Sequence, residues 1–556
     1  MTDPHSSPWE AWLNKWFVLL LAPGILVNVS GLFIRIIEPD GALYAMIART
    51  IAETGDFIHL RVEGRDWLDK PHFPFWLAAV SFRIFGINSF AYKLPALLFW
   101  AAGGAYVYRL AKEIYGRSIA QLSVLMYVSA AHLVISNNDV RAEPYLTGLV
   151  IGAVYHFYKA SRVRPGLHLA AGSLLTACAM MTKGPFVLVT IAGGFILDWI
   201  ISKEWAQFRN FRWGIALLLT GVFIIPELYC LYIQFDLHPE TRVFGRTGVS
   251  GIRFFFWDSQ FGRFFNTGPI KGAGDPFFYF HTLLWAFLPW SLLLYASMFR
   301  GIIRRAVPGD RIIWGGAVIS FAMFSLSRFQ LPHYLNILFP FFAMLTASYL
   351  YRIRRRATIR IITLVQGIII FILPALVILL CWLFHFSGWL YVLLVFLALS
   401  VLPFFWFRGN MFTSAVGRSY WMALLAFLFI NCCLYPVMLR YQAGMSAGDY
   451  LRSQVPACNT LYMPEKAPEN YSIEFYAPCP VRRVSPDSLP AILVRGQALF
   501  FARPAYSDTL IREGYHVDRL QRFPNFHVSQ LSGEFLDHRT RQRSLEWFEL
   551  IRVSDH

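Results

Sequence analysis

Long hydrophobic runs, separated by short polar segments, recur along the chain from residue 16 to residue 438. Most of them are about 17 to 23 residues long, which is enough for an α-helix to cross the hydrocarbon core of a bilayer. We therefore predict about thirteen transmembrane helices. Their expected ranges are 16–36, 93–109, 118–135, 142–158, 167–182, 184–201, 213–234, 278–299, 312–327, 333–351, 361–381, 389–407 and 419–438.

Basic residues follow every even-numbered predicted span, whereas the short loops on the other side carry only Arg141, Arg328 or none. Cytoplasmic loops of membrane proteins are enriched in Lys and Arg, so this pattern predicts a cytoplasmic N-terminus and a C-terminal tail outside. The basic positions are Arg109, Lys112, Arg117, Lys159, Arg162, Arg164, Lys203, Arg209, Arg212, Arg300, Arg304, Arg305, Arg311, Arg352, Arg354, Arg355, Arg356, Arg360, Arg408 and Arg418.

Two loops predicted on the outer side are unusually long, 37–92 and 235–277. In the first loop, Leu43, Ile47 and Ile51 are spaced four apart, which is typical of an amphipathic helix lying on a membrane surface. The apolar segment 73–86 is short and is flanked by Pro and Gly. We expect that segment to be re-entrant or interfacial, because counting it as a span would place the later arginine clusters outside.

From residue 439 onward, short apolar runs alternate with polar residues and turn residues. This pattern predicts a small soluble domain of mixed α/β structure on the outer face. We therefore divide the chain into a transmembrane domain, 1–438, and a soluble domain, 439–556. Cys458 and Cys479 fall in the second, where an oxidising compartment would allow a disulfide. Two free structural thiols are the alternative.

Composition agrees with a membrane protein and excludes a soluble one. Of the 556 residues, 56% are hydrophobic and only 15% are charged, and the mean hydropathy is +0.47. No soluble globular protein of this size has such a composition. The net charge of +17 reflects the basic cytoplasmic loops, so we do not expect nucleic acid to be a partner.

Polar residues at the outer ends of the predicted spans all belong to one face of the membrane. A group that mixes carboxylates with cations on one face is typical of a site that binds an anion and moves a proton. The group comprises Glu38, Asp40, Asp69, Lys70, Asp139, Arg141, Glu143, Lys183, Arg253, Asp258, Arg263, Arg328 and His333.

Five short motifs occur in sequence order along the first ten spans: EPDGALYA, WLDKPHFPFW, RAEPYLTG, MTKGPF and SRFQLPHYLNILFP. In these motifs the chain resembles the aminoarabinose-lipid A transferases and, more distantly, the protein O-mannosyltransferases. The resemblance implies a polytopic α-helical membrane protein of GT-C type, with about thirteen transmembrane helices and a small mixed α/β periplasmic C-terminal domain. It also implies a bacterial inner (cytoplasmic) membrane, with the N-terminus cytoplasmic and the C-terminal domain periplasmic.

Asp40 matches the catalytic aspartate of the family at the start of the first outer loop. A carboxylate there would accept a proton from the attacking group of the acceptor, or orient that group. Alternatively, Asp40 N-caps the amphipathic helix that follows it. The family commonly has Asp-Glu where this chain has Asp40-Gly41, and Glu38 is the candidate to substitute for the missing acid.

Lys70 matches the family's lysine that binds the lipid phosphate. A fixed cation at this position would stabilise a departing phosphate anion. A lysine that snorkels to the interface is the alternative. Arg263, in the second long loop, is the expected second phosphate clamp, since a guanidinium suits bidentate contact. Arg253 competes with Arg263 for that role.

Glu143 and Lys183 match an acidic and a basic position of the family, although single charges at span ends often only face the interface. We assign Glu143 as a second catalytic candidate, and Lys183 and Arg328 as further phosphate-binding cations. The expected substrate-binding residues are Glu38, Asp69, His333 and Tyr334. His333 is equally consistent with a hydrogen-bonded residue at a helix start.

Some relatives hold a metal between an acid near the lysine-proline motif and a histidine of the second long loop. Here the acid would be Asp69, but no histidine lies near Gln260. We therefore predict no firmly held metal site and no other cofactor, while a loosely bound divalent metal stays possible.

The resemblance implies an inverting glycosyltransferase. Its expected partners are a polyprenyl-phosphate sugar donor, membrane lipids, and an envelope acceptor such as lipid A or another glycolipid. A protein O-mannosyltransferase-like enzyme is one alternative. A transporter or flippase of lipid-linked sugars is another, although transporters carry ionisable residues near mid-membrane and these spans have few.

Overall fold

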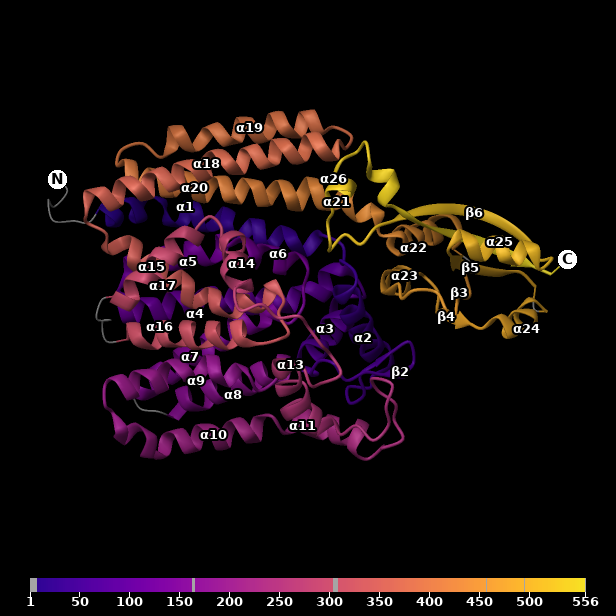
Figure 1. Cartoon of the computed structure of the whole chain (residues 1–556), viewed down its shortest axis with the longest axis horizontal. Coiled ribbons are helices and arrows are strands. Elements are labelled where there is room, and N and C mark those ends of the chain that lie inside the picture. The colour runs from indigo at the N-terminus through magenta and orange to yellow at the C-terminus, as the bar shows by residue number, and fades with distance from the viewer. Residues whose placement is uncertain (1–7, 163–165, 304–308, 457, 495, 556) are drawn as a thin grey trace.

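The computed structural model describes residues 8–162, 166–303, 309–456, 458–494 and 496–555. Of the basic positions used to predict topology, Arg164, Arg304 and Arg305 lie outside the described residues. A large bundle of helices makes up most of the molecule, and a smaller domain with a β-sheet projects from one end (Figure 1). The N-terminus lies at the other end of the bundle.

The helices of the bundle run mainly along its long axis (Figure 1). They are α1 Pro8–Ser30, η1 Gly31–Phe33, α4 Ser89–Tyr115, α5 Arg117–Ser129, α6 Ala131–Asn138, α7 Glu143–Arg162, α8 Gly166–Lys183, α9 Val187–Ile201, η2 Trp205–Arg209, α10 Phe211–Phe223, α11 Ile225–Leu231, η3 Tyr232–Asp236, α14 Phe278–Ala286, α15 Ser291–Ile303, α16 Asp310–Leu326, η5 Pro332–Leu338, α17 Phe339–Arg352, α18 Arg356–Phe384, α19 Trp389–Trp406, α20 Met411–Phe429, η6 Ile430–Leu434 and α21 Tyr435–Met438.

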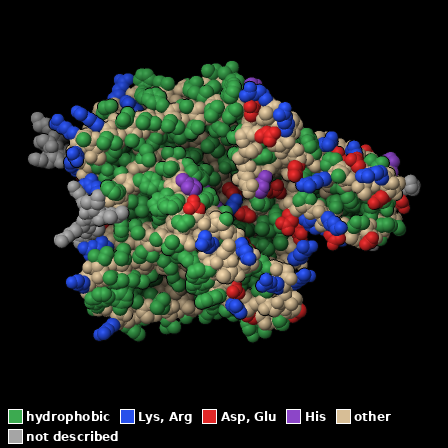
Figure 2. All heavy atoms as spheres, viewed as in Figure 1, with side chains coloured by type: hydrophobic (Ala, Val, Ile, Leu, Met, Phe, Trp, Pro, Cys, Tyr) green, Lys and Arg blue, Asp and Glu red, His purple; other side chains and the backbone are tan. Residues whose placement is uncertain are grey.

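The outside of the bundle is apolar, as it must be to lie in lipid. Leu217, Phe371 and Tyr391 are each about 70% exposed or more, and hydrophobic side chains cover much of the visible face of the bundle (Figure 2). Among the described residues, five helices are long and apolar enough to cross a membrane, or up to seven if each bent pair forms one span. The chain is therefore a multi-pass membrane protein.

The predicted number of about thirteen spans stays a prediction, because several predicted spans are broken helices. The span 118–135 becomes α5 and α6 with a bend of 50°, and the span 213–234 bends by 40° between α10 and the helix that follows. The apolar run 278–299 is divided into α14 and α15. Hydropathy alone cannot reveal such breaks, since both halves of a broken helix stay apolar.

The loops that follow the even-numbered predicted spans lie at the end of the bundle where α1 begins. Lys159 pairs with Glu113 at 2.9 Å, which joins the end of α7 to the end of α4. The hydroxyl of Tyr351, near the end of α17, donates to Glu10 of α1 at 3.0 Å. The basic loops therefore lie together on one side of the bundle, and the two long loops lie at the opposite end.

The first long loop folds into α2 Asp40–Thr54, a hairpin of β1 Arg61–Val62 and β2 Arg65–Asp66, and α3 Phe73–Phe85. The apolar stripe of α2 packs on α3, with Ile47, Ile51, Phe75 and Ala79 all buried. The second long loop contains α12 Gly251–Arg253, η4 Phe254–Asp258 and α13 Phe261–Phe265. Both loops thus carry short helices near the outer ends of the longer ones.

The C-terminal domain is built around a five-stranded sheet with strand order β4-β3-β5-β7-β6. β3 pairs in parallel with β4 and β5, whereas β7 pairs antiparallel with β5 and β6. Its elements are η7 Leu439–Tyr441, α22 Ala443–Gln454, β3 Leu461–Pro464, α23 Tyr471–Tyr476, β4 Val481–Val484, η8 Pro486–Ser488, α24 Leu489–Leu493, β5 Ala498–Ala502, α25 Pro504–Arg512, β6 His516–Asn525, α26 Gly533–Leu536, η9 Arg541–Ser544 and β7 Glu546–Ser554.

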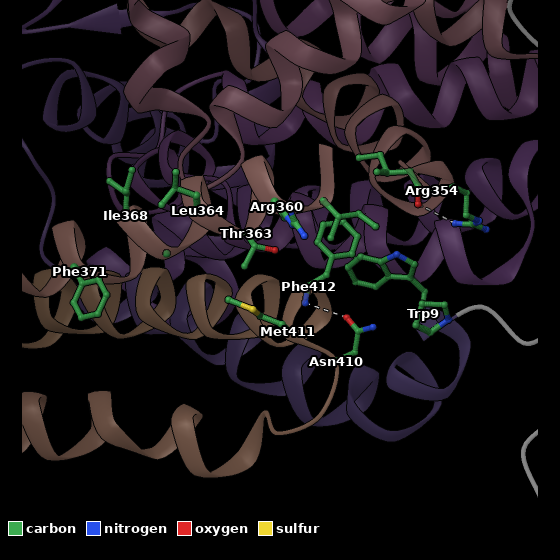
Figure 3. Close-up of a pocket in the computed structure, with 14 residues that line it drawn as sticks. Trp9, Arg354, Arg360, Thr363, Leu364, Ile368, Phe371, Asn410, Met411 and Phe412 are labelled. Carbon is green, nitrogen blue, oxygen red and sulfur yellow. Dashed lines mark hydrogen bonds between the residues drawn. The ribbon is translucent and has the colours of Figure 1, made fainter. Parts of the chain in front are cut away.

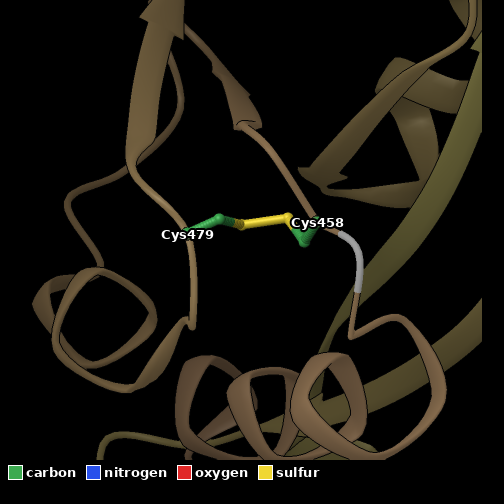
Figure 4. Close-up of a disulfide and its surroundings, with 2 residues drawn as sticks. All are labelled: Cys458 and Cys479. Atoms are coloured by element: carbon green, nitrogen blue, oxygen red, sulfur yellow. A yellow bond between two sulfur atoms is a disulfide. The ribbon is translucent and has the colours of Figure 1, made fainter.

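Alternating side chains of the strands serve two separate cores, as expected for a sheet covered on both faces. Phe501 packs in one core with Leu451 of α22, and its neighbour Phe500 packs in the other with Leu510 of α25. A disulfide between Cys458 and Cys479, whose Cα atoms are 5.8 Å apart, joins the segments that lead into β3 and β4 (Figure 4).

The C-terminal domain contacts the bundle at two places. The hydroxyl of Tyr476 accepts a hydrogen bond of 2.9 Å from the backbone of Ile36, just before α2. At the other contact, the Arg541 guanidinium donates to the carbonyl of Phe384, at the end of α18, at 2.8 Å. The domain is therefore held against both the first long loop and the outer end of α18.

Candidate active site

A polar cavity of about 160 Å³ lies where the first long loop, the second long loop and the ends of several bundle helices meet. Ten of the residues that line it carry polar or charged side chains, drawn from segments far apart in the sequence. The lining residues are Asp40, Tyr44, Asp69, Lys70, Arg141, Ala142, Glu143, Lys183, Arg263, Ile270, Phe329, Leu331, His333 and Tyr334.

Asp40 is the first residue of α2, and Arg141 holds its carboxylate. The Arg141 Nη1 atom lies 2.6 Å from Asp40 Oδ2, and Nη2 lies 2.8 Å from Asp139 Oδ2. The Asp40 side chain is 39% exposed, so it can be reached from the cavity. The residue at the N-cap position is Pro39, so the alternative that Asp40 caps α2 is wrong.

Asp69 sits between two cations. Its carboxylate forms ion pairs with Lys70 and with Arg263, which brings the two long loops together. Burial alone would raise the pKa of Asp69, but the charges of Lys70 and Arg263 outweigh it and lower the pKa below its usual value. Burial lowers the pKa of Lys70, and Asp69 opposes that shift. Lys70 thus lies inside a cavity, which argues against a snorkelling lysine.

Glu143, at the start of α7, and Lys183, at the end of α8, form a buried ion pair. His333 Nε2 approaches the same carboxylate at 3.7 Å. The Lys183 ammonium also lies 3.8 Å from the centre of the Tyr334 ring, a cation–π contact. These charged side chains therefore contact each other within the protein and do not face the lipid as interface anchors.

Gly184 explains why the MTKGPF motif has a glycine after its lysine. Its φ of 107° disfavours any residue with a Cβ atom. A Cβ added there would also collide with the amide of Gln260 in the second long loop. The motif therefore permits that loop to close over the end of α8.

An apolar groove of about 430 Å³ adjoins the polar cavity. Four residues line both spaces, namely Lys183, Arg263, Phe329 and Tyr334. The rest of the groove is mostly aliphatic and aromatic. Its other lining residues are Pro185, Phe186, Leu188, Val189, Phe256, Ser259, Gln260, Phe261, Phe264, Phe265, Met323, Phe324 and Ser327. The arrangement suits a molecule with an anionic head and a long hydrocarbon tail.

Glu38 and Arg328 are not among the residues that line this cavity. The Glu38 carboxylate accepts a hydrogen bond of 2.8 Å from the backbone N–H of Ser472, so Glu38 belongs to the contact with the C-terminal domain. The Arg328 side chain is exposed, and its backbone N–H donates to Phe264. The structure thus brings together eight of the ten predicted site residues and separates these two, because each is held by a contact with a segment distant in sequence.

Arg253, the competitor of Arg263, is also outside the cavity: its side chain is 73% exposed and lies 3.6 Å from Asp258. Two polar residues that line the cavity were given no individual role from the sequence, Tyr44 and Arg141, although Arg141 belonged to the predicted group of polar residues at span ends. Tyr44 lies one helical turn after Asp40. This spacing puts both residues on one face of α2 and could have identified Tyr44 from the sequence.

Among the described residues, no group of three or more His, Cys, Asp or Glu could hold a metal.

Comparison with known sequences places this site in a wider context. Residues 69–229 match the model of the family described as dolichyl-phosphate-mannose-protein mannosyltransferase. An "uncharacterized protein" of Aquifex aeolicus is 23% identical over 500 residues, which cover 88% of this chain and 93% of that protein.

Other relatives are named for an activity. The undecaprenyl phosphate-alpha-4-amino-4-deoxy-L-arabinose arabinosyl transferase of Edwardsiella ictaluri is 27% identical over 323 residues. The match covers 57% of this chain and 56% of that enzyme. The enzyme of the same name from Enterobacter sp. is 25% identical, with 60% and 58% covered. The chain thus matches little more than half the length of these transferases.

Among solved structures, the fold is similar to that of ArnT from Cupriavidus metallidurans bound to undecaprenyl phosphate. The TM-score is 0.74 at 17% identity, and the match covers 97% of this chain and 98% of that one. ArnT in the apo state gives a TM-score of 0.73. The chain therefore has the GT-C membrane glycosyltransferase fold, and its resemblance to the aminoarabinose transferases, first indicated by five short motifs, is confirmed.

Proposed function

We propose that this protein is an inverting glycosyltransferase that moves a sugar from a polyprenyl-phosphate donor to lipid A or another envelope glycolipid. The observation that carries the proposal is the junction of the two spaces. A cavity lined by Asp40, Lys70 and Arg263 adjoins an apolar groove, and Arg263 lines both. The groove would hold the isoprenoid tail, and the cavity would hold the phosphate and the sugar.

The reaction requires the acceptor oxygen to form a bond to the anomeric carbon while the bond from that carbon to the phosphate oxygen breaks. Asp40 would accept the proton of the acceptor hydroxyl, or orient an acceptor phosphate that has no proton to give. Its ion pair with Arg141 holds the carboxylate in place at the cavity. The electron pair of the broken bond leaves with polyprenyl phosphate.

Lys70 and Arg263 would stabilise the departing phosphate. Two cations side by side repel one another, and the carboxylate of Asp69 between them lowers that repulsion and fixes their positions. Preorganised charges of this kind need not reorganise as charge develops in the transition state. Lys183 is available as a third cation on the groove side, where Glu143 and Tyr334 hold it.

Glu143 is a weaker base candidate than Asp40, because its side chain is only 4% exposed and already pairs with Lys183. We therefore propose that Glu143 positions Lys183. We also propose that the cavity and the C-terminal domain face the periplasm of a bacterial inner membrane and that the N-terminus is cytoplasmic. The segregation of the basic loops and a disulfide in the C-terminal domain support this orientation.

The decisive experiment replaces Asp40 with Asn in the purified protein. Transfer of aminoarabinose from its undecaprenyl-phosphate donor to lipid A is followed by mass spectrometry. We expect turnover to fall by about 10²- to 10⁴-fold, the usual contribution of a general base, while donor binding is retained. Asp56→Asn is the matched control, because Asp56 lies in the same loop but pairs with His59 outside the cavity.

Full activity of Asp40→Asn would refute the assignment of the base. A wild-type protein that glycosylates envelope proteins and not lipid A would instead favour the mannosyltransferase alternative, which the family model matched to residues 69–229 also suggests. Donor binding without transfer to any acceptor would favour a transporter.

A further inference from the structure

A second, larger cavity of about 750 Å³ opens at the end of the bundle that carries the N-terminus. It lies between the start of α1, the connection from α17 to α18, and the start of α20 (Figure 3). The lining residues are Pro8, Trp9, Ile353, Arg354, Ile359, Arg360, Thr363, Leu364, Gly367, Ile368, Phe371, Asn410, Met411 and Phe412. We call this space the α18 groove.

The α18 groove follows one face of a helix for the depth of a single lipid leaflet. Arg360, Leu364, Ile368 and Phe371 recur every three or four residues, so they share one face of α18. At 1.5 Å per residue, they span about 16 Å, which is close to half of a hydrocarbon core about 30 Å thick. Figure 3 shows Arg360 near one end of this row and Phe371 at the other.

The walls of the groove are exposed and apolar. Phe371 is 70% exposed, Leu364 is 65% exposed, and Met411 on the opposite wall is 76% exposed. Gly367 has nothing within 4 Å of the place where a Cβ atom would stand, so the helix surface there is open. A hydrocarbon chain would cover these side chains without needing any hydrogen bond.

The mouth of the groove is positively charged. Arg354 and Arg360 line it, and no carboxylate in the described part of the chain pairs with either. Arg354 is held in place by hydrogen bonds of 2.8 and 3.2 Å to the carbonyls of Tyr351 and Ile353. Three long helices, α1, α18 and α20, also begin at or beside this mouth, and helix N-termini attract anions.

We propose that the α18 groove binds an anionic phospholipid of the bilayer, with its phosphate at Arg354 and Arg360 and one acyl chain along α18 as far as Phe371. This site is separate from the proposed donor site. The groove lies at the start of α1 and the polar cavity beyond its end, and a helix of 23 residues is about 35 Å long. The lipid would bind whether or not the proposed transfer reaction is correct.

The test uses the purified full chain and native mass spectrometry. The protein is titrated with phosphatidylglycerol or phosphatidylcholine of identical acyl chains. We expect wild-type protein to retain phosphatidylglycerol preferentially. Arg354→Gln combined with Arg360→Gln should weaken that retention by about fivefold per arginine. The control combines Arg109→Gln with Arg117→Gln, two exposed arginines near the same end of the bundle that do not line the groove.

A third variant, Gly367→Leu, tests the acyl chain and not the charge. Because open space surrounds Gly367, the new side chain should fill the groove without disturbing the fold and should also reduce retention. Equal retention of the two lipids, an equal loss in the control variant, or no effect of Gly367→Leu would each overturn the proposal. Displacement of phosphatidylglycerol by equimolar undecaprenyl phosphate would overturn it too, because the groove would then prefer polyprenyl lipid.

Discussion

Two clusters of charged residues include members of the first long loop, and they differ in what lies between their members. The polar cavity holds Asp69, Lys70 and Arg263 around about 160 Å³ of space and adjoins an apolar groove. At the docking contact, Arg483 of the C-terminal domain pairs with Glu63 of the first long loop at 2.9 Å, and Glu63 also bonds to Glu474. There the carboxylates and the arginine contact one another directly.

The difference shows that buried charge alone does not identify an active site. Both clusters mix carboxylates with arginines, both join segments distant in sequence, and both shift the pKa of a carboxyl group. The first leaves cationic side chains around an open space beside an apolar groove, whereas Arg483 of the second pairs directly with Glu63. The following predictions test whether the first cluster serves chemistry and the second serves only docking.

Among the variants that compare the two clusters, the largest effect is expected at Lys70. Lys70→Met should lower kcat by about 10²- to 10³-fold, the usual cost of removing one preorganised electrostatic contact. Single-turnover transfer with the donor bound beforehand measures this loss. Arg253→Met is the control, since Arg253 also lies on a long outer loop but is 73% exposed and paired with Asp258. If both variants lost activity equally, the distinction between the cavity and its surroundings would fail.

A smaller effect is expected at Glu38, and it should fall on stability. Glu38→Ala removes the acceptor of the Ser472 N–H bond at the docking contact. The free energy of unfolding should drop by about 1–3 kcal/mol, the cost of one unsatisfied buried polar group. Turnover should change by less than a factor of a few.

Thermal unfolding of the purified protein measures the first quantity, and the transfer assay measures the second. Glu38→Gln is the matched variant, because its side-chain oxygen can still accept the bond and should restore most of the stability. A large loss of turnover in Glu38→Gln would instead support the prediction that Glu38 binds substrate.

The smallest effect concerns pH. Burial, the hydrogen bond to Glu63 and the charge of Glu63 raise the pKa of Glu474 to about 9 from a usual 4.5. Between these two values the folded protein keeps a proton that the unfolded chain releases, so stability should fall as pH rises from about 4.5 to about 9. Glu474→Gln keeps a hydrogen-bond donor toward Glu63 but has no proton to lose in this pH range. The stability of this variant should therefore depend less on pH.

Melting temperatures at pH 6 and pH 9 measure this dependence. We expect the wild-type protein to lose a few degrees more than Glu474→Gln between the two values. Glu513→Gln, an exposed carboxylate of the same domain, should behave as wild type. Identical pH profiles for wild type and Glu474→Gln would show that this carboxyl is ionised at the docking contact.

The sequence by itself determined the fold class and most of the site. Hydrophobic runs of membrane-crossing length, basic residues on alternate loops and a final segment of alternating polarity are local features, and each depends only on nearby residues. The motifs around Asp40, Lys70 and Lys183 likewise identified their residues without any knowledge of packing. The fold and the resemblance are confirmed, and the roles of the residues stay predictions.

Only the tertiary structure decided which charges face the cavity and which face the domain contact. Glu38 and Asp40 are two residues apart, yet one bonds to Ser472 and the other to Arg141. Arg253 and Arg263 lie on one loop, yet only Arg263 lines the cavity. The direction of a side chain on a long loop depends on the segments that pack against that loop, and those segments lie hundreds of residues away. No local pattern in the sequence carries that information.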